Sequence, residues 1–232
     1  MKIGVIPARL HSTRLPEKIL LPIAGVPMIV RVYQQAVRAK SLNKVIVAID
    51  DKKTEKVLNR YGISGIMTGK HHSSGTDRAA EAVRNEDAKV IVNIQGDEPE
   101  IEPELIDEIV DLCEEKNTEI ATAASTELRS DEILDRDVVK VKINKKNFAT
   151  SFLRRPFSEK EIFRHIGIYG FKKNILDTFT SLPPSKNEVN QKLEQYRALD
   201  NGINIRILVT DYRGRGVDTM MDLKRMELKY AS

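Results

Sequence analysis

The chain has 232 residues, of which 41% are hydrophobic and 31% are charged, and its formal net charge is +4 at pH 7. This composition is ordinary for a globular protein with one core, and it argues against a fibrous or a disordered chain. Lysine and arginine are interspersed with nearly as many acidic residues, and tryptophan is absent, which argues against a nucleic-acid-binding protein. A small phosphorylated ligand fits this charge pattern better.

No apolar run approaches the roughly 20 residues that a membrane-spanning helix needs. The first residues, Lys2 to Ile6, form a strand-like pattern and not a signal peptide, so we expect a cytoplasmic protein without membrane insertion. The single cysteine, Cys113, excludes an internal disulfide and a multi-cysteine metal site. Its position in a helical pattern predicts a buried apolar side chain.

Short apolar runs alternate with helical patterns in the first half of the chain. This alternation is typical of βαβ units built around a parallel sheet. The predicted strands cover residues 2–7, 44–49, 65–67 and 90–94, and the predicted helices cover residues 28–39, 52–61, 77–84 and 103–115.

The pattern changes after Glu119. Strands are predicted over 120–125, 138–143 and 166–171 without regular helices between them, which indicates a mixed sheet. Ser185 and Glu188 form a capping-box signature ahead of a helix that continues to about Asn201 and stops at Gly202. A strand over 203–209 and a helix from about Met221 complete the chain.

Together these elements predict one α/β domain, residues 1–232, with a Rossmann-like mixed sheet that is predominantly parallel and has helices on both faces. In such a sheet, ligands bind beyond the carboxyl ends of the strands. The loops that follow the predicted strands are therefore the first places to look for a site.

The loop after the first strand, residues 7–18, carries three cations and two hydroxyls. Arg9, Arg14 and Lys18 can neutralise a polyphosphate, because a guanidinium binds two oxygens at once and an ammonium acts as a point charge. Ser12 and Thr13 add hydroxyls and backbone N–H groups. The alternative is a solvated basic loop, and the residues match neither a Walker A sequence nor a G-x-G-x-x-G turn.

The strand predicted over 90–94 leads into Gln95-Gly96-Asp97-Glu98-Pro99. Pro99 ends the pairing of this strand, which brings Asp97 to the same edge of the sheet as the basic loop. Mg²⁺ is commonly held by one or two carboxylates together with substrate phosphates, so Asp97 is a candidate ligand. The alternative is a turn-forming aspartate beside glycine and proline.

A second candidate acid, Asp218, lies in the glycine-containing loop after the strand predicted over 203–209. Asp218 or Thr219 can instead be the N-cap of the last helix, with Asp222 completing a capping box. If Asp97 and Asp218 meet, they can hold a divalent metal beside a transferring phosphate.

Small polar residues precede the helix predicted over 77–84. Ser74 and Gly75 allow a base or ribose to approach the backbone, and Arg78 can face a phosphate or the base. The adjacent His71 and His72 face different ways on a helix or a strand, which argues against a zinc site.

Alternation along residues 164–171 places His165 and Tyr169 on one face of a strand. A hydrogen-bonded core histidine is the equally open alternative. On the following predicted helix, Glu194, Gln195 and Arg197 are expected at the surface unless that helix borders a pocket.

Taken together, these segments resemble the 3-deoxy-manno-octulosonate cytidylyltransferases, the CMP-sugar-acid synthetases of bacterial lipopolysaccharide assembly. The resemblance covers nearly the whole chain. The shared motifs, in chain order, are Pro-Ala-Arg and Ser-Thr-Arg-Leu-Pro-x-Lys from Pro7, Ser-Gly-Thr-Asp-Arg from Ser74, Gln-Gly-Asp-Glu-Pro from Gln95, His-Ile-Gly-Ile-Tyr-Gly from His165, Leu-Glu-Gln-x-Arg from Leu193 and Gly-Val-Asp-Thr from Gly216.

The resemblance implies a magnesium-dependent transferase that joins CMP from CTP to an octulosonate-type sugar acid, releases pyrophosphate and forms a homodimer. Residues 1–118 and 200–232 then provide mainly the nucleotide and metal side, and residues 119–199 mainly the sugar and dimer side. The implied catalytic residues are Lys18, Asp97 and Asp218, with Mg²⁺ bound by the two aspartates. The implied nucleotide contacts are Pro7, Ala8, Arg9, Ser12, Arg14, Lys18, Ser74, Gly75, Arg78 and Gln95, and the implied sugar contacts are Arg154, His165, Tyr169, Glu194 and Gln195.

The chain departs from the family where the family has Ser-Arg-x-x-Ile-Pro and a longer loop. Here Leu153-Arg154-Arg155-Pro156-Phe157-Ser158 is followed by a short connection to His165, and Glu17 stands where glycine is frequent. Three alternatives stay open. The substrate can be a modified octulosonate such as the 8-amino-8-deoxy sugar, the enzyme can be a nucleotidyltransferase for another sugar acid or a sugar phosphate, or the chain can be a nucleotide-sensing binding module.

Overall fold

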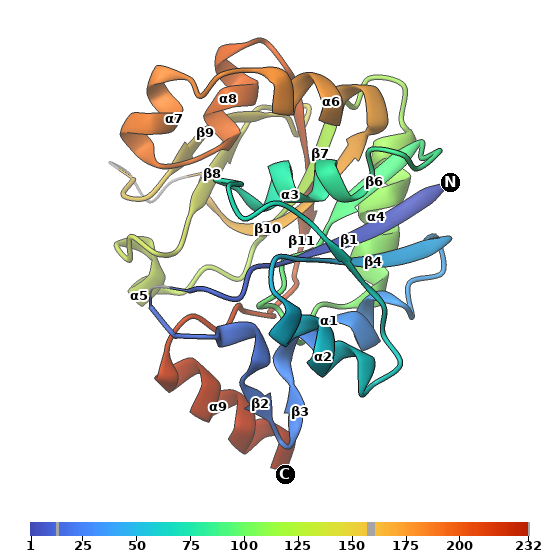
Figure 1. Cartoon of the computed structure of the whole chain (residues 1–232). Helices are drawn as coiled ribbons and strands as arrows, with labels where there is room; N and C mark the ends of the chain where they lie inside the picture. The colour runs from blue at the N-terminus through green and yellow to red at the C-terminus, as the bar shows by residue number, and fades with distance from the viewer. Residues whose placement is uncertain (13, 157–160, 232) are drawn as a thin grey trace. The chain divides into compact units, whose positions relative to one another are not determined.

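The computed structural model describes residues 1–12, 14–156 and 161–231 (Figure 1). The chain divides into two compact units. Unit 1 comprises Met1–Ala88, Val92–Asp107 and Gly214–Ser232, and unit 2 comprises Lys89–Ile91 and Glu108–Arg213. Both ends of the chain therefore belong to unit 1.

In the main sheet, the strand pairs of unit 1 whose register is defined are parallel. β1 (Lys2–Ala8) pairs with β4 (Lys44–Ile49), and β4 pairs with β5 (Gly65–Met67). The end of β6 (Val90–Asn93) lies beside β1, since the backbone N–H of Ile94 donates to the carbonyl of Val5 at 2.8 Å. Most apolar side chains of β1 and β4 are buried, as expected for parallel strands that are covered on both faces.

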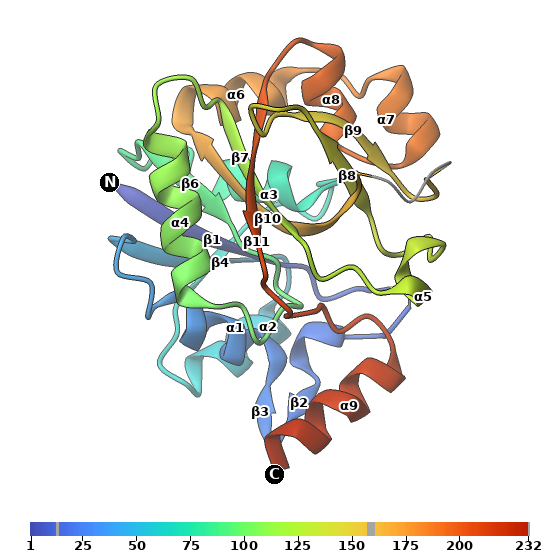
Figure 2. The ribbon, with the colours of Figure 1, turned by 180° about the vertical axis from the view of Figure 1, so that it is seen from behind.

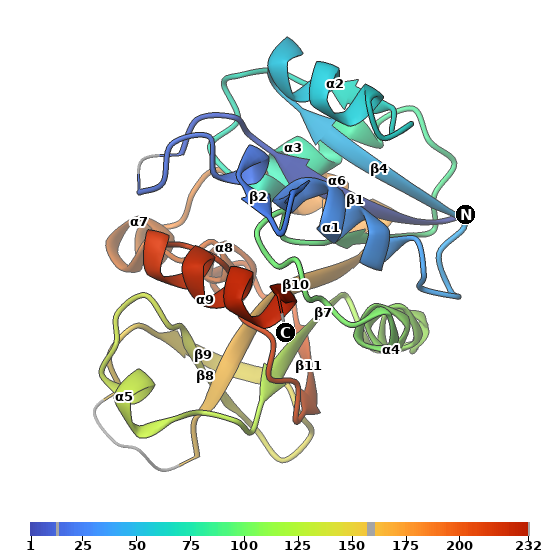
Figure 3. The same cartoon turned by 90° about the horizontal axis from the view of Figure 1, so that it is seen from below.

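Helices cover both faces of β1 and β4. α3 (Gly75–Ala82) packs on one face and α1 (Met28–Ala36) on the other (Figures 1 and 3). α2 (Lys52–Asn59) begins at the N-cap Asp51, whose carboxylate accepts from the backbone of Lys53. A short 3-10 helix, η1 (Lys18–Leu20), follows the loop after β1.

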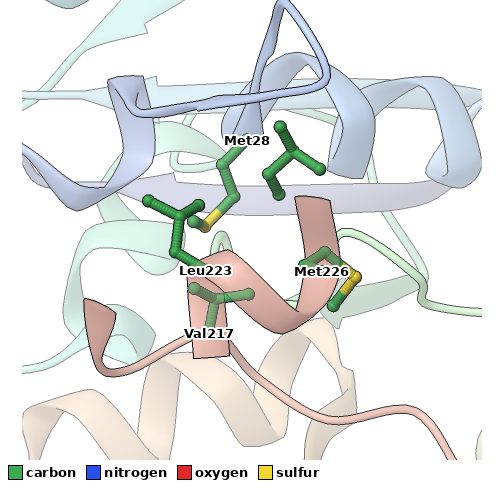
Figure 4. Packing of buried hydrophobic residues seen from close by; sticks show 5 residues of the cluster. Met28, Val217, Leu223 and Met226 are labelled. Atoms are coloured by element: carbon green, nitrogen blue, oxygen red, sulfur yellow. The ribbon is translucent and has the colours of Figure 1, made fainter. Parts of the chain in front are cut away.

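The C-terminal helix α9 (Met220–Ala231) packs on a small hairpin formed by β2 (Pro22–Ile23) and β3 (Val26–Pro27). The cluster that joins them, called the α9 cluster here, is shown in Figure 4. Its buried members are Ile23, Met28, Val217, Leu223 and Met226. Because Val217 belongs to this cluster, burial of the cluster also fixes the loop that carries Asp218.

Unit 2 contains the mixed sheet that the sequence predicts. β7 (Ile120–Ser125) lies between β11 (Ile205–Thr210), which is parallel to it, and β10 (Phe163–Lys172), which is antiparallel (Figure 2). β8 (Lys140–Ile143) pairs with both β10 and β9 (Ala149–Leu153), and both pairings are antiparallel.

In chain order, α4 (Pro103–Glu114) precedes β7, α5 (Ser130–Ile133) lies between β7 and β8, and α6 (Lys173–Ser181) follows β10. The prediction of no regular helix between the strands was wrong only at the four-residue helix α5, and α6 and β9 were not predicted. Cys113, on α4, is buried as predicted, and burial raises the pKa of its thiol to about 12. No helix in the described part of the chain combines the length and the apolarity that crossing a membrane requires.

The single helix predicted over residues 185–201 is two helices, α7 (Lys186–Gln191) and α8 (Gln195–Asp200). The chain breaks because Lys192 adopts the left-handed conformation, with φ of 54°, at the end of α7. The predicted capping box of Ser185 and Glu188 is confirmed, and so is the stop at Gly202, where φ is 72°.

Candidate active site

Unit 1 contains a cavity of about 310 Å³, a size that is sufficient for a small ligand. Nine of the ten residues predicted to bind nucleotide line it, together with both predicted metal ligands: Pro7, Arg9, Ser12, Arg14, Lys18, Ser74, Gly75, Arg78, Gln95, Asp97 and Asp218. Ala8 is predicted for this set but is fully buried in β1 and does not line the cavity. Thr13 lies outside the described residues.

Four of these side chains converge at one point of the cavity. The ammonium of Lys18 donates to Asp97 Oδ2 at 2.5 Å and to Asp218 Oδ1 at 2.8 Å. Arg14 Nη2 donates to the same oxygen of Asp218 at 2.9 Å. Two acids that are 121 residues apart in the printed sequence therefore meet and share one cation.

The ammonium of Lys18 is held in its charged form. Its side chain is only 11% exposed, and this burial by itself lowers the pKa. The charge of Asp97 and the hydrogen bonds to Asp218 and Asp97 outweigh burial, so the pKa of Lys18 is raised above its usual value. The lysine therefore supplies a permanent positive charge to the cavity at neutral pH.

Two close backbone contacts bring the acids together. A Cβ at Gly96 would lie 2.8 Å from the carbonyl oxygen of Pro7, so only glycine allows the loop after β6 to pass the end of β1 at this distance. The backbone N–H of Val217 donates to the carbonyl of Asp97 at 2.9 Å. Asp218 is the next residue, and its side chain is thereby brought beside Asp97.

Thr219, and not Asp218, caps helix α9. The hydroxyl of Thr219 accepts from the backbone N–H of Asp222 at 3.2 Å, and the carboxylate of Asp222 accepts from the backbone N–H of Thr219 at 2.9 Å. The carboxylate of Asp218 contacts Lys18 and Arg14 instead. The capping alternative raised for the loop is therefore fulfilled by Thr219, and it leaves Asp218 in the cavity.

The α3 side of the cavity is built on a buried ion pair. Ser74 is the N-cap of α3 and accepts from the backbone N–H of Asp77 at 3.1 Å. Arg78, which is 3% exposed, donates to Asp50 Oδ2 at 3.1 Å and to the hydroxyl of Thr68 at 2.6 Å. The other oxygen of Asp50 accepts from the backbone N–H of Leu10 at 2.9 Å, so this pair also anchors the basic loop.

Sequence reasoning missed four residues of the cavity wall: Ile19, His72, Ser73 and Gly96. It also missed Asp50, although its position at the end of β4 is the kind of place where a polar residue meets the loop of a neighbouring parallel strand.

The donor atoms of the cavity fit a magnesium ion. Asp97 and Asp218 offer carboxylate oxygens, and both carboxylates already converge on a single positive charge, that of Lys18. Within residues 1–12, 14–156 and 161–231, no group of three or more His, Cys, Asp or Glu side chains is arranged to hold a metal. Mg²⁺ needs only one or two protein carboxylates when substrate phosphates and water complete its octahedron.

In unit 2, His165 and Tyr169 lie on the same face of β10, as predicted, with ring centroids 5.5 Å apart. Burial, followed by the charge of Arg164, lowers the pKa of His165 to about 3, so its imidazole is neutral at pH 7. Thr122 Oγ1 lies 3.1 Å from His165 Nε2. The hydroxyl of Tyr169 accepts from Gln195 Nε2, and burial raises the pKa of this tyrosine.

Gln195 and Arg197 are buried, which corrects the expectation that they lie at the surface. The guanidinium of Arg197 pairs with Glu188 at 2.6 Å, so this residue stabilises the contact between α7 and α8. Glu194 is the N-cap residue of α8, next to Gln195, and its charge contributes to the raised pKa of Tyr169.

Arg154 makes its contacts with backbone carbonyls. Its guanidinium donates to the carbonyls of Arg136, Gln191 and Lys192 at 2.9, 3.2 and 3.0 Å. It therefore binds the end of α7, where helix carbonyls lack partners within the helix. Phe157 and Ser158, which belong to the segment that departs from the family, lie outside the described residues.

Known proteins match this chain over almost its full length. Residues 3–206 match the family model described as cytidylyltransferase. A 3-deoxy-manno-octulosonate cytidylyltransferase of Chloroherpeton thalassium is 42% identical, over 96% of this chain and 95% of the relative. Another, from Syntrophotalea carbinolica, is 41% identical, over 97% of this chain and 96% of the relative.

Solved structures match the fold. The structure of a CMP:2-keto-3-deoxy-manno-octonic acid synthetase complexed with CTP gives a TM-score of 0.93 at 34% identity, over 99% of this chain and 98% of that chain. A cytidylyltransferase from Leptospira borgpetersenii serovar Hardjo-bovis gives a TM-score of 0.67 at 21% identity, over 99% of this chain and 87% of that chain, which bears on the fold alone. The first match confirms the predicted mixed α/β fold with a mostly parallel sheet flanked by helices.

Proposed function

Because the chain belongs to the family of 3-deoxy-manno-octulosonate cytidylyltransferases, we propose that it transfers CMP from CTP to an octulosonate-type sugar acid and releases pyrophosphate. The observation that carries this proposal is the convergence of Lys18, Asp97 and Asp218 in a cavity that Arg9 and Arg14 also line. Such a group of cations and acids suits a triphosphate and its counter-cation.

In the proposed reaction, a hydroxyl oxygen of the sugar acid forms a bond to the α-phosphorus of CTP. The bond from this phosphorus to the bridging oxygen of the β-phosphate breaks, and the hydroxyl proton is released. Lys18, Arg9 and Arg14 bind the phosphate oxygens and offset the negative charge that grows on the departing pyrophosphate. The role of the protein is positioning and charge neutralisation, so no covalent intermediate with the chain is needed.

The proposed metal ligands are Asp97 and Asp218. Mg²⁺, when bound, neutralises phosphate charge and makes a coordinated hydroxyl more acidic. Ser74, Gly75, Arg78 and Gln95 are proposed to hold the nucleoside part of CTP, because they line the same cavity.

The proposed sugar-binding residues lie in unit 2. His165 offers a neutral imidazole, and Tyr169 and Gln195 are joined by a hydrogen bond, so these residues present polar groups of fixed orientation to a sugar. For Arg154 the support is weaker, because its guanidinium donates to three backbone carbonyls. A homodimer and a role in lipopolysaccharide synthesis are proposed from the resemblance alone, and a cytoplasmic location is proposed from the sequence pattern of the first residues.

A second candidate substrate is a modified octulosonate, such as the 8-amino-8-deoxy sugar. The observation that favours it is the short connection from Arg154 to Arg164, which departs from the family on the proposed sugar side. The reaction and the nucleotide are the same in both candidates.

Pyrophosphate release tests both candidates. The assay combines CTP, UTP, ATP or dTTP with 3-deoxy-manno-octulosonate or its 8-amino-8-deoxy analogue. We expect CTP to give the highest kcat/KM with either sugar. A preference for UTP or dTTP would rule out the cytidylyltransferase, and binding of CTP without any pyrophosphate release would favour the nucleotide-sensing module.

A further inference from the structure

His72 lines the nucleotide cavity and is held there by an acid that the proposed reaction does not use. Its side chain is 11% exposed, and its Nε2 atom contacts Glu81 Oε2. The same oxygen of Glu81 accepts from the backbone N–H of Gly69 at 3.0 Å. Neither His72 nor Glu81 belongs to the residues assigned above.

Helix α3 fixes the whole segment that carries His72. Arg78 and Glu81 are three residues apart on this helix and therefore lie on one face of it. Arg78 binds the hydroxyl of Thr68 at the start of the segment, and Glu81 binds the backbone of Gly69. The position of His72 in the wall is thus set by α3 at two points.

Gly69 leaves room for the imidazole of His71. A Cβ at this position would overlap Cε1 of His71, so a larger residue fits only if that imidazole moves. The rings of His71 and His72 lie next to each other, with centroids 4.5 Å apart. His71 is exposed and does not line the cavity, which makes it a matched control for its neighbour.

The contact with Glu81 determines what His72 can offer to a ligand. The hydrogen bond from His72, followed by that from Gly69, lowers the pKa of Glu81, so its carboxylate is ionised at neutral pH. A carboxylate that engages one imidazole nitrogen fixes the orientation of the ring. The second nitrogen, Nδ1, is then available for a hydrogen bond in a defined direction. Ser73 and Ser74 line the cavity next to it.

We propose that His72 contacts an oxygen atom of the bound nucleotide and that Glu81 is a positioning residue that orients its imidazole. This inference rests on the proposed binding of CTP. It adds a nucleotide contact on the α3 side of the cavity. This contact comes from a different part of the sequence than the cations of the loop after β1. Either a phosphate oxygen or a ribose hydroxyl can form a hydrogen bond with the imidazole, and the experiment distinguishes the two.

The first measurement is the Kd for CTP by isothermal titration calorimetry with the full-length chain. We expect His72→Asn to weaken binding about tenfold, the loss of one good hydrogen bond, and the control His71→Asn to change Kd less than about twofold. Because the contact serves binding, KM for CTP rises in His72→Asn while kcat changes little. Equal Kd values for the wild type and His72→Asn overturn the inference while leaving the proposed function intact.

Glu81→Gln tests the positioning role. We expect it to weaken CTP binding about threefold to tenfold in the wild-type background and to have no further effect in the His72→Asn background, because its action passes through the imidazole. Equal weakening in both backgrounds contradicts the positioning role. Thermal unfolding of each variant shows whether weaker CTP binding results from loss of the folded structure. His72→Gln provides a second substitution at the same position for this comparison.

Titrations with CMP and cytidine identify the oxygen. If His72→Asn weakens CTP but not cytidine, the contact is to a phosphate; if it weakens all three equally, the contact is to the ribose. Both results support the inference. A wild-type chain that binds none of the three overturns the proposed function and, with it, this inference.

Discussion

At the scale of single residues, Glu17 shows how a local departure from the family is accommodated. Its backbone has φ of 52° and ψ of 29°, the left-handed region that glycine adopts without steric cost. Its carboxylate binds Lys53, but both side chains are about half exposed, so this ion pair contributes little to stability. The frequent glycine of the family is therefore explained by the backbone conformation just before Lys18.

Substitutions at Glu17 follow from this conformation. We expect Glu17→Gly to change the free energy of unfolding by less than about 1 kcal/mol, because relieved strain offsets the added freedom of the unfolded chain. Glu17→Val is expected to be less stable than Glu17→Gly by about 1–2 kcal/mol, since a β-branched residue is strained at positive φ. Urea unfolding of the two variants measures the difference, and equal stability would contradict the account of this turn.

At the scale of elements, helix α9 depends on its first turn. The reciprocal hydrogen bonds of Thr219 and Asp222 form its N-terminal cap. We expect Thr219→Ala to lower the free energy of unfolding by about 1 kcal/mol, the usual cost of a lost N-cap side chain. Thr219→Ser, which keeps the hydroxyl, serves as the control in the same thermal or urea measurement. A loss that is equal in both variants would show that the hydroxyl is not the stabilising group.

A buried lysine joins several segments of unit 2. The ammonium of Lys140 donates to the carbonyls of Asp135, Val138 and Arg154 at 2.6, 2.7 and 2.9 Å, and burial lowers its pKa. We expect Lys140→Met to lower the free energy of unfolding by at least about 2 kcal/mol, because three carbonyls lose their donor. Lys142→Met, on the same strand, is the control. A stability close to that of wild type in Lys140→Met would contradict this role.

The elements of the first half could be predicted from sequence because each is a local pattern. The bounds of β4 and β5 match the predicted residues, and α1 to α3 differ from prediction only at their ends. The break between α7 and α8 could not be predicted, since it depends on Lys192 in a left-handed conformation and on Arg154, 38 residues away, which binds its carbonyl. Tertiary contacts of this kind leave no local signal.

The candidate site was predictable to the extent that it follows from sheet geometry. Asp97 and the loop with Lys18 meet because they follow β6 and β1, which are neighbours in the sheet. His72 was missed because it lies in the cavity wall through a contact with Glu81, nine residues later on α3, and the pair has no motif of its own. Arg154 was assigned from the family alone, and its contacts with backbone carbonyls were not predictable from the residues around it.

At the scale of the whole molecule, His165 contributes to the dependence of stability on pH. Burial and the charge of Arg164 lower its pKa in the folded chain to about 3, from 6.5 for an unperturbed histidine. The unfolded chain therefore binds more protons between these two values, and the contribution of His165 to stability is present above pH 6.5 and is lost as pH falls toward 3.

Urea unfolding at pH 7.5 and pH 5.0 measures this effect. We expect the wild type to lose more stability between the two pH values than His165→Gln, since the variant lacks the titrating group and the other acidic residues are common to both chains. An equal loss in the two proteins would show that His165 is not held neutral by the fold.

The central claim concerns Asp97 and Asp218, which share the ammonium of Lys18 and are proposed to bind Mg²⁺ beside CTP. The most direct measurement is turnover, by pyrophosphate release from CTP and octulosonate with Mg²⁺, for Asp97→Asn, Asp218→Asn and the exposed control Asp111→Asn. Each of the first two variants is expected to fold and to lose at least about a hundredfold in kcat, the scale of one lost charge-stabilising group, while the control retains wild-type turnover. Full activity in either Asp97→Asn or Asp218→Asn would contradict the account.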